Sequence, residues 1–152
     1  MIQRVQSVYL FASLCFMISM FFTPISELVY ETGEILFFDF TGFIIKEAET
    51  VTRISNQYSI MAFGILICAL NLITIFMYKR RVLQIRLCIY NILLILGILG
   101  IVFFVNKTIP NIESVSYRLP IVFPIIAVIL QYLAYRGIRK DELMVQALSR
   151  LR

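Results

Sequence analysis

The sequence predicts an all-α membrane protein with four transmembrane helices, and two observations carry that prediction. Of the 152 residues, 61% are hydrophobic, well above the share of about 45–50% that is usual in soluble domains. The apolar residues also gather in four long runs instead of recurring with the period of an amphipathic helix or a strand. We therefore expect a single integral membrane domain over residues 1–152, which excludes an ordinary globular enzyme core.

Each apolar run is long enough to cross a bilayer as a helix. Helices of about 17–19 residues reach roughly 26–29 Å, close to the hydrocarbon thickness of about 30 Å. The expected helices cover residues 5–22, 60–78, 87–105 and 119–135. We expect the first to be retained and not cleaved as a signal, because no small-x-small pattern follows it. The fourth run is the shortest, so its helix stands near upright or continues past Tyr135.

The basic residues predict which side of the membrane each loop occupies. Most of the 14 Lys and Arg residues fall on one face of a four-helix topology: Arg4, Lys79, Arg80, Arg81, Arg86, Arg136, Arg139, Lys140, Arg150 and Arg152. The other face holds Lys46, Arg53, Lys107 and Arg118. By the positive-inside rule, both termini, the loop 79–86 and the tail 136–152 are cytoplasmic, and the loops 24–58 and 106–118 are external.

The first external loop is long and acidic. Within it, LVYETGEILFFDFTGFII reads as two extended runs around a Thr-Gly-Glu turn, rich in β-branched and aromatic residues. We expect a small β-hairpin that leans on the membrane surface or on the second external loop, since two strands alone are marginal. The phenylalanines at positions 37, 38, 40 and 43 suit an interfacial position at the headgroup level.

Polar side chains inside the runs are few. The candidates for an interhelical hydrogen-bond clamp are Asn71, Asn91 and Gln131, because amides join helices across a bundle by hydrogen bonds. The cysteines at 15, 68 and 88 are read as small packing residues. Gly97 and Gly100 in GILG allow close helix approach, either within the monomer or in a homo-oligomer.

Catalytic chemistry is hard to assemble from this sequence. With no histidine, neither a serine–histidine nor a cysteine–histidine nucleophile can be built. Gly-rich phosphate loops and zinc-protease motifs are also missing. We expect no enzyme, catalytic residue, metal or cofactor, although a pair of outer-loop carboxylates such as Glu31 and Asp39 stays open as an alternative.

The basic face carries the most informative chemistry. The loop YKRRVLQIR places four positive charges at the headgroup plane, where anionic lipid would attract them. In the tail KDELMVQALSRLR, Met144, Leu148 and Leu151 recur at helical spacing beside a charged face, which predicts an amphipathic cytoplasmic helix. Such a helix lies on the bilayer, packs under the bundle, or docks on a protein or RNA.

Three motifs together resemble a known family. MIQRVQSVYL, YKRRVLQIRLC and LAYRGIRKDELMVQALSRLR are similar to those of small four-pass inner-membrane proteins of Bacteroidota, domain of unknown function four-two-nine-three. The residues that match the family pattern are Gln3, Arg4, Tyr9, Gln84, Arg86, Arg136, Arg139, Lys140, Asp141, Glu142, Arg150, Leu151 and Arg152. The resemblance implies a four-helix protein of the bacterial inner membrane with a variable outer loop, and it brings no activity.

We therefore expect a non-enzymatic accessory or scaffold subunit that docks on a larger inner-membrane assembly through its basic cytoplasmic face. Anionic lipid and other membrane proteins are the expected partners, with the Sec translocon and its ribosome considered first, and DNA is not expected. The alternatives are a small oligomeric channel or carrier, with the three amides lining its path, and a membrane-embedded enzyme.

Overall fold

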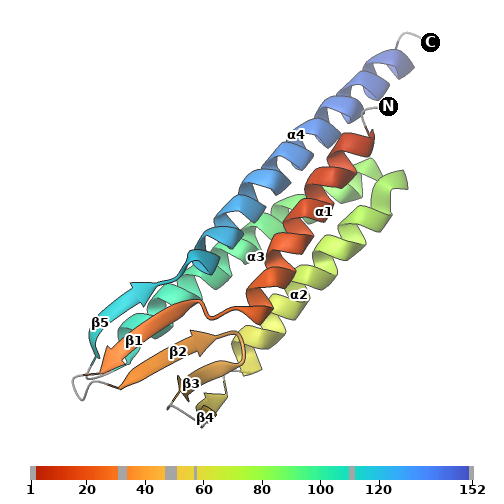
Figure 1. Cartoon of the computed structure of the whole chain (residues 1–152). Coiled ribbons are helices and arrows are strands. Elements are labelled where there is room, and N and C mark those ends of the chain that lie inside the picture. Colours follow the sequence, from red (N-terminus) through yellow and green to blue (C-terminus); the bar gives the residue numbers. More distant parts are fainter. Residues whose placement is uncertain (1–2, 31–33, 47–50, 57, 110–111, 151–152) are drawn as a thin grey trace.

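The computed structural model describes residues 3–30, 34–46, 51–56, 58–109 and 112–150. In this part of the chain, four α-helices form an elongated bundle with a β-sheet at one end (Figure 1). The helices are α1 (Gln3–Ser19), α2 (Tyr58–Phe76), α3 (Arg81–Thr108) and α4 (Val122–Arg150). Short 3-10 turns follow α1 and α2 and precede α4: η1 (Met20–Phe22), η2 (Met77–Lys79) and η3 (Leu119–Ile121).

Four helices among the described residues are long and apolar enough to cross a membrane, as the hydropathy predicts. The helix α1 begins, and α4 ends, at the end of the bundle that also holds the α2–α3 turn (Figure 1). We call this the basic end, and the opposite one the sheet end. Both ends of the chain thus lie at the same end of the bundle, as predicted for four helices. The two segments expected as loops, 24–58 and 106–118, lie at the sheet end.

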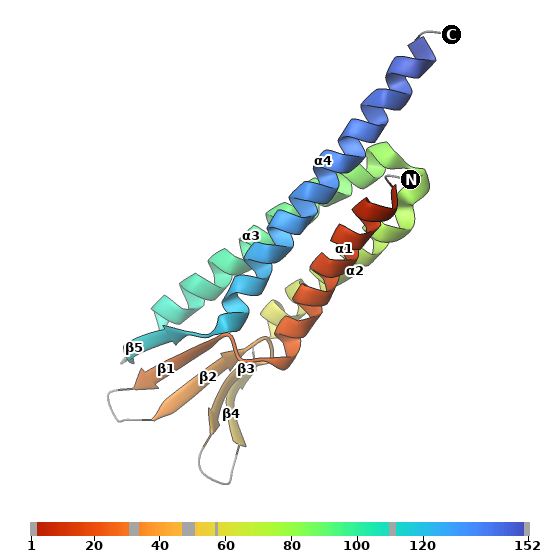
Figure 2. The ribbon, with the colours of Figure 1, turned by 45° about the horizontal axis from the view of Figure 1, so that its top comes forward.

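Two predicted boundaries at the basic end are wrong. The loop expected over 79–86 is mostly helical, because α3 begins at Arg81. The tail is not a separate amphipathic helix but the last part of α4, which runs unbroken to Arg150 and projects past the other helices (Figure 2), in agreement with the alternative that the fourth helix continues past Tyr135. Most residues of RGIRKDELMVQ are good helix formers and none is a proline, so the helix is not broken after Tyr135.

The segments expected as external loops form a five-stranded antiparallel sheet within the described residues, so the fold is mostly helical and not all-α. Its strands are β1 (Ser26–Tyr30), β2 (Ile35–Asp39), β3 (Gly42–Lys46), β4 (Val51–Asn56) and β5 (Ile112–Tyr117), in the order β4-β3-β2-β1-β5. The expected hairpin corresponds to β1 and β2. The expected support from the second loop is confirmed, because β5 pairs with β1.

A turn that the prediction missed splits the second extended run into β2 and β3. The Asp39 Oδ1 accepts hydrogen bonds from the backbone N–H groups of Thr41 and Gly42, at 2.7 and 3.0 Å. Gly42 has a φ of 136°, a conformation that residues with a Cβ rarely adopt. This turn lets β3 fold back on β2, with Phe38 opposite Phe43.

The sheet packs its aromatic side chains inward against the helix ends. Phe38, Phe40 and Phe43 are buried, so the expected interfacial position is wrong for these three, whereas Phe37 is only partly buried. The Phe40 ring stacks on Phe21 with centroids 4.6 Å apart. Both rings lie over Gly64 of α2, where a Cβ would meet Phe21 at 2.7 Å and Phe40 at 2.9 Å. Glycine at this position therefore lets the aromatic pair approach the helix backbone.

A buried polar link also joins the sheet to the bundle. The Asn106 Nδ2 near the end of α3 donates a hydrogen bond of 3.0 Å to the Ser26 Oγ at the start of β1. Both residues are almost fully buried. Because an unpartnered amide at this position would be costly, this bond fixes β1 relative to α3.

Candidate functional site

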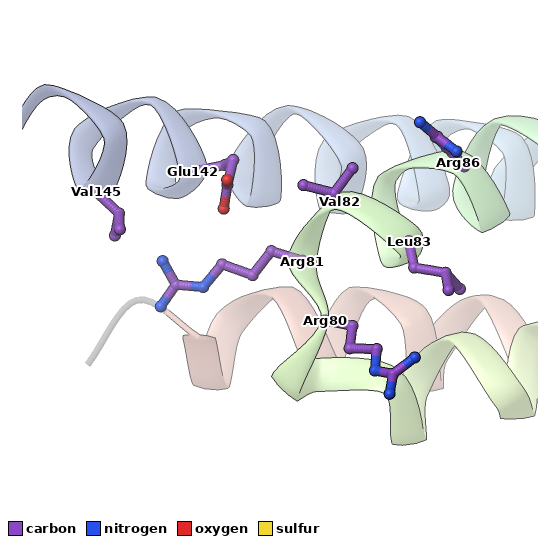
Figure 3. Close-up of a pocket in the computed structure, with 7 residues that line it drawn as sticks. All are labelled: Arg80, Arg81, Val82, Leu83, Arg86, Glu142 and Val145. Atoms are coloured by element: carbon purple, nitrogen blue, oxygen red, sulfur yellow. The ribbon is translucent and has the colours of Figure 1, made fainter. Parts of the chain in front are cut away.

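A cavity of about 690 Å³ opens at the basic end, between the start of α3 and the projecting part of α4. We call it the basic pocket; its lining residues are Arg80, Arg81, Val82, Leu83, Arg86, Glu142 and Val145. Figure 3 shows the Arg81 side chain extending toward the stretch of α4 that carries Glu142 and Val145. Three guanidinium groups against one carboxylate make the lining predominantly positive.

The pocket forms because α3 begins early, at Arg81, and because α4 continues to Arg150. Arg80 precedes α3 without a side-chain cap on the helix, and Arg81 and Arg86 lie in its first two turns. Glu142 and Val145 face them only because α4 continues well past Tyr135. Among the described residues, the structure records no ion pair for the three arginines.

The other predicted basic residues are placed less closely together. Arg136, Arg139 and Lys140 are exposed on α4, and the Arg139 Nη1 donates a hydrogen bond of 3.2 Å to the Tyr135 Oη. Arg4, Lys79 and Arg150 have side chains outside the described set, and Arg152 lies outside the described residues altogether. The structure therefore gathers Arg80, Arg81 and Arg86 into one site and leaves Arg136, Arg139 and Lys140 outside it.

Two hydrogen bonds fix the helices around the pocket. The Gln84 Nε2 in α3 donates to the Thr74 carbonyl oxygen of α2 at 3.1 Å, across the η2 turn. The Gln6 Nε2 in α1 donates to the Asp141 Oδ2 of α4 at 2.7 Å. Gln84 and Asp141 both belong to the motifs that carry the family resemblance. Their roles here are structural, since each holds together two helices at the basic end.

A second candidate site lies in the core of the bundle. Each helix contributes one buried polar side chain at the same level: Ser13, Asn71, Asn91 and Gln131. We call these four residues the polar layer. The Ser13 Oγ accepts a hydrogen bond of 3.4 Å from the Asn71 Nδ2 and donates one of 3.3 Å to the Ala127 carbonyl oxygen. Ser13 therefore connects α1, α2 and α4, a role the sequence analysis did not assign to it.

Apolar side chains enclose the polar layer on both sides. One helical turn toward the sheet end lie members of the larger core cluster, namely Met17, Ile67, Ile95 and Ala127. One to two turns toward the basic end lies a separate cluster of Leu10, Cys88, Ala134 and Ile138. Ser13, Asn91 and Gln131 each have buried apolar neighbours three or four positions away in both directions, whereas on α2 the buried position three after Asn71 is Thr74.

Several polar atoms of this layer lack a partner. The atoms are the Asn71 Oδ1, both amide atoms of Asn91 and both amide atoms of Gln131. Each unpartnered polar group buried in a protein costs about 1–3 kcal/mol. The three predicted amides thus share one layer with Ser13, but the described structure places no hydrogen bond directly between them.

The remaining candidates are placed as follows. Cys88 is buried in the basic-end cluster, as expected for a packing residue, while Cys68 is partly exposed and Cys15 is exposed. Gly97 and Gly100 lie on an open face of α3, where a Cβ would meet nothing within 4 Å. They therefore do not serve close packing within the described chain. Of the two outer-loop carboxylates, Asp39 is engaged in the β2–β3 turn, and Glu31 lies outside the described residues.

Four long apolar helices joined to a small antiparallel sheet are typical of an integral membrane protein of the helical class. Within that class, the chain belongs to the family described as Domain of unknown function (DUF4293), whose model matches residues 2–151. The family resemblance seen in the three sequence motifs is thereby confirmed. A comparison with curated proteins gives no match.

Proposed function

We propose that the chain is a non-enzymatic accessory or scaffold subunit of a larger assembly in the bacterial inner membrane, with its basic end in the cytoplasm. The observation that supports this proposal is the projecting part of α4 (Figure 2). Leu143, Met144 and Val145 are 57%, 43% and 48% exposed on this stretch, beyond the helical length needed to cross the bilayer. A contiguous apolar patch exposed outside a bundle marks a candidate contact with a protein or a membrane.

The proposed partner is another inner-membrane protein that packs on the projecting part of α4. The export translocon is the first to look for, because its cytoplasmic surface lies among ribosomal RNA and anionic lipid, both of which suit a basic face. Mild-detergent purification with identification of the co-purifying proteins tests this. Recovery of the chain as a clean monomer at low salt contradicts it.

A variant pair sharpens this experiment. Leu143→Glu with Met144→Glu should abolish co-purification without affecting membrane insertion, because both side chains lie outside the bundle. The matched control is Ile129→Ala with Leu133→Ala, which removes exposed apolar atoms from the membrane-spanning part of α4. Equal loss of partner in both variants would place the contact within the membrane and not on the projecting helix.

Anionic phospholipid is the partner proposed for the basic pocket itself. Guanidinium groups bind phosphate with charge-assisted, often bidentate hydrogen bonds. Val82, Leu83 and Val145 offer apolar surface for the glycerol and upper acyl-chain carbons of the lipid. Phosphatidylglycerol should therefore stabilise the purified protein against heat more than phosphatidylcholine does. Replacing Arg80, Arg81 and Arg86 by Gln should remove that difference, whereas Gln at Arg136, Arg139 and Lys140 should preserve most of it. Equal loss in the two triple variants would show that only overall charge matters.

The observation that favours the alternative, a small channel or carrier, is the presence of buried polar side chains inside the bundle, namely the polar layer. Two apolar clusters enclose that layer, which counts against a continuous polar path through the described bundle. Substituting Asn91 and Gln131 by Leu should leave the flux of any solute unchanged under the scaffold proposal. A change of flux with folding intact would favour the carrier.

A further inference from the structure

We propose that the polar layer is a binding site for internal water, held between the four helices. This inference is independent of the proposed docking function, because it concerns the core of the bundle and not its basic end. It rests on side chains that are almost completely buried: Asn71 and Gln131 are 0% exposed, and Asn91 is 1% exposed. None of the five unpartnered atoms of these amides can reach bulk solvent in this conformation.

The unpartnered atoms determine which occupant fits. The Asn91 and Gln131 amides each present one oxygen that accepts and one NH₂ group that donates, and Asn71 adds a further acceptor. If the oxygen and nitrogen of the Asn91 or Gln131 amide are exchanged, the side chain still needs one donor and one acceptor as partners, because either orientation presents a C=O and an NH₂ group. A bare cation would serve only the oxygens, and a bare anion only the nitrogens. Water both donates and accepts, so it satisfies the whole set.

The surroundings explain why water would stay in place. Hydrocarbon cannot hydrogen-bond the amides, and the apolar clusters on both sides separate the layer from the headgroup regions. Buried waters in proteins typically make about three hydrogen bonds to otherwise unsatisfied groups. The Ser13 Oγ adds a further polar atom at this level and already bonds α2 and α4. The site thus offers an internal water the number of partners it needs.

Water-edited solid-state NMR of the full chain in lipid bilayers tests the proposal. Magnetisation passed from water should reach the side-chain amides of Asn91 and Gln131 severalfold faster than the methyl groups of Ile67 and Ile98, which are equally buried. Equal build-up for amides and methyl groups would overturn the proposal. So would a direct contact between the Asn91 and Gln131 amides with no transfer from water, because the two side chains would then satisfy each other.

A variant locates the water. In Asn91→Leu, transfer from water to the Gln131 amide should fall at least twofold, because one of the groups that hold the water is gone. The control is Asn106→Leu, which removes a buried amide of α3 that is already bonded to Ser26; transfer to Gln131 should be unchanged there. Unchanged transfer in Asn91→Leu would exclude Asn91 from the site, and if that variant does not fold, the wild-type measurement decides alone.

Discussion

The Nε2 of Gln6 donates a 2.7 Å hydrogen bond to the Asp141 carboxylate, across 135 positions of sequence. Gln6 is only 6% exposed, so its amide depends on this partner. Gly137, one turn before Asp141, leaves the space that Gln6 occupies, since a Cβ there would lie 3.0 Å from the Gln6 Cγ. This bond joins the first turns of α1 to the part of α4 that leaves the bundle.

Asp141→Ala should destabilise the bundle by about 1–2 kcal/mol, because it leaves the buried Gln6 amide without an acceptor. Thermal unfolding in detergent, followed by circular dichroism, measures this. Glu142→Ala is the control: among the described residues, the hydrogen bond recorded for the Glu142 carboxylate comes from Gln146 within α4, so its loss should cost about 0.5 kcal/mol or less. A larger effect for Glu142 than for Asp141 would contradict this assignment.

Gly64→Ala should lower stability although alanine favours helices. The added methyl would lie 2.7 Å from the Phe21 Cζ and 2.9 Å from the Phe40 Cε1. Such overpacking costs about 1–3 kcal/mol, against a gain of about 1 kcal/mol in helix propensity. In Gly97→Ala the added methyl meets nothing within 4 Å, so the variant should gain stability from helix propensity without a packing cost. Comparing the melting temperatures of the two variants tests the contrast.

Asn106→Leu should loosen the sheet from the bundle, because it removes the bond to Ser26. Hydrogen exchange measured by mass spectrometry should become faster in β1 and β5 while α1 and α2 stay protected. Thr108→Val is the matched control, since the bond recorded for its Oγ1 goes to the Phe104 carbonyl oxygen of the same helix, at 2.8 Å. Unchanged exchange in β1 of the Asn106 variant would show that aromatic packing alone holds the sheet.

Gly42→Ala should destabilise the β2–β3 turn by about 1 kcal/mol or more, because of its φ of 136°. Limited proteolysis of the sheet reports the effect as faster cleavage. Thr41→Val serves for comparison: it loses the 2.6 Å hydroxyl bond to the Asp39 Oδ1 but keeps both backbone bonds to that carboxylate. Cleavage should therefore increase less in the Thr41 variant.

Hydropathy predicted the helices well, because a continuous apolar run is a local property of the sequence. It could not locate the start of α3 at Arg81 or the end of α4 at Arg150, since charged residues that form good helices carry no hydropathy signal. The basic pocket was missed for that reason: its arginines were expected in a loop, and Glu142 and Val145 in a separate tail.

The sheet was underestimated for a different reason. Leu36, Phe38 and Phe40 recur with the period of two that places them on one face of a strand, but the pattern does not say whether lipid headgroups or helix ends cover that face. The pairing of β1 with β5 joins segments on either side of two helices, and no local pattern predicts such a pairing. The clamp predicted among Asn71, Asn91 and Gln131 is not seen as hydrogen bonds between them. The part played by Ser13 became clear only from its bonds to α2 and α4.

The place of β5 in the sheet has a consequence for the order in which the chain is completed during synthesis. β1 to β4 are consecutive, so they can pair as soon as the segment before α2 is available. The free edge of β1 must wait until α2 and α3 have both been made and β5 has followed them. The sheet end is therefore finished only when the third helix is in place, which makes the β1–β5 pairing a late assembly step.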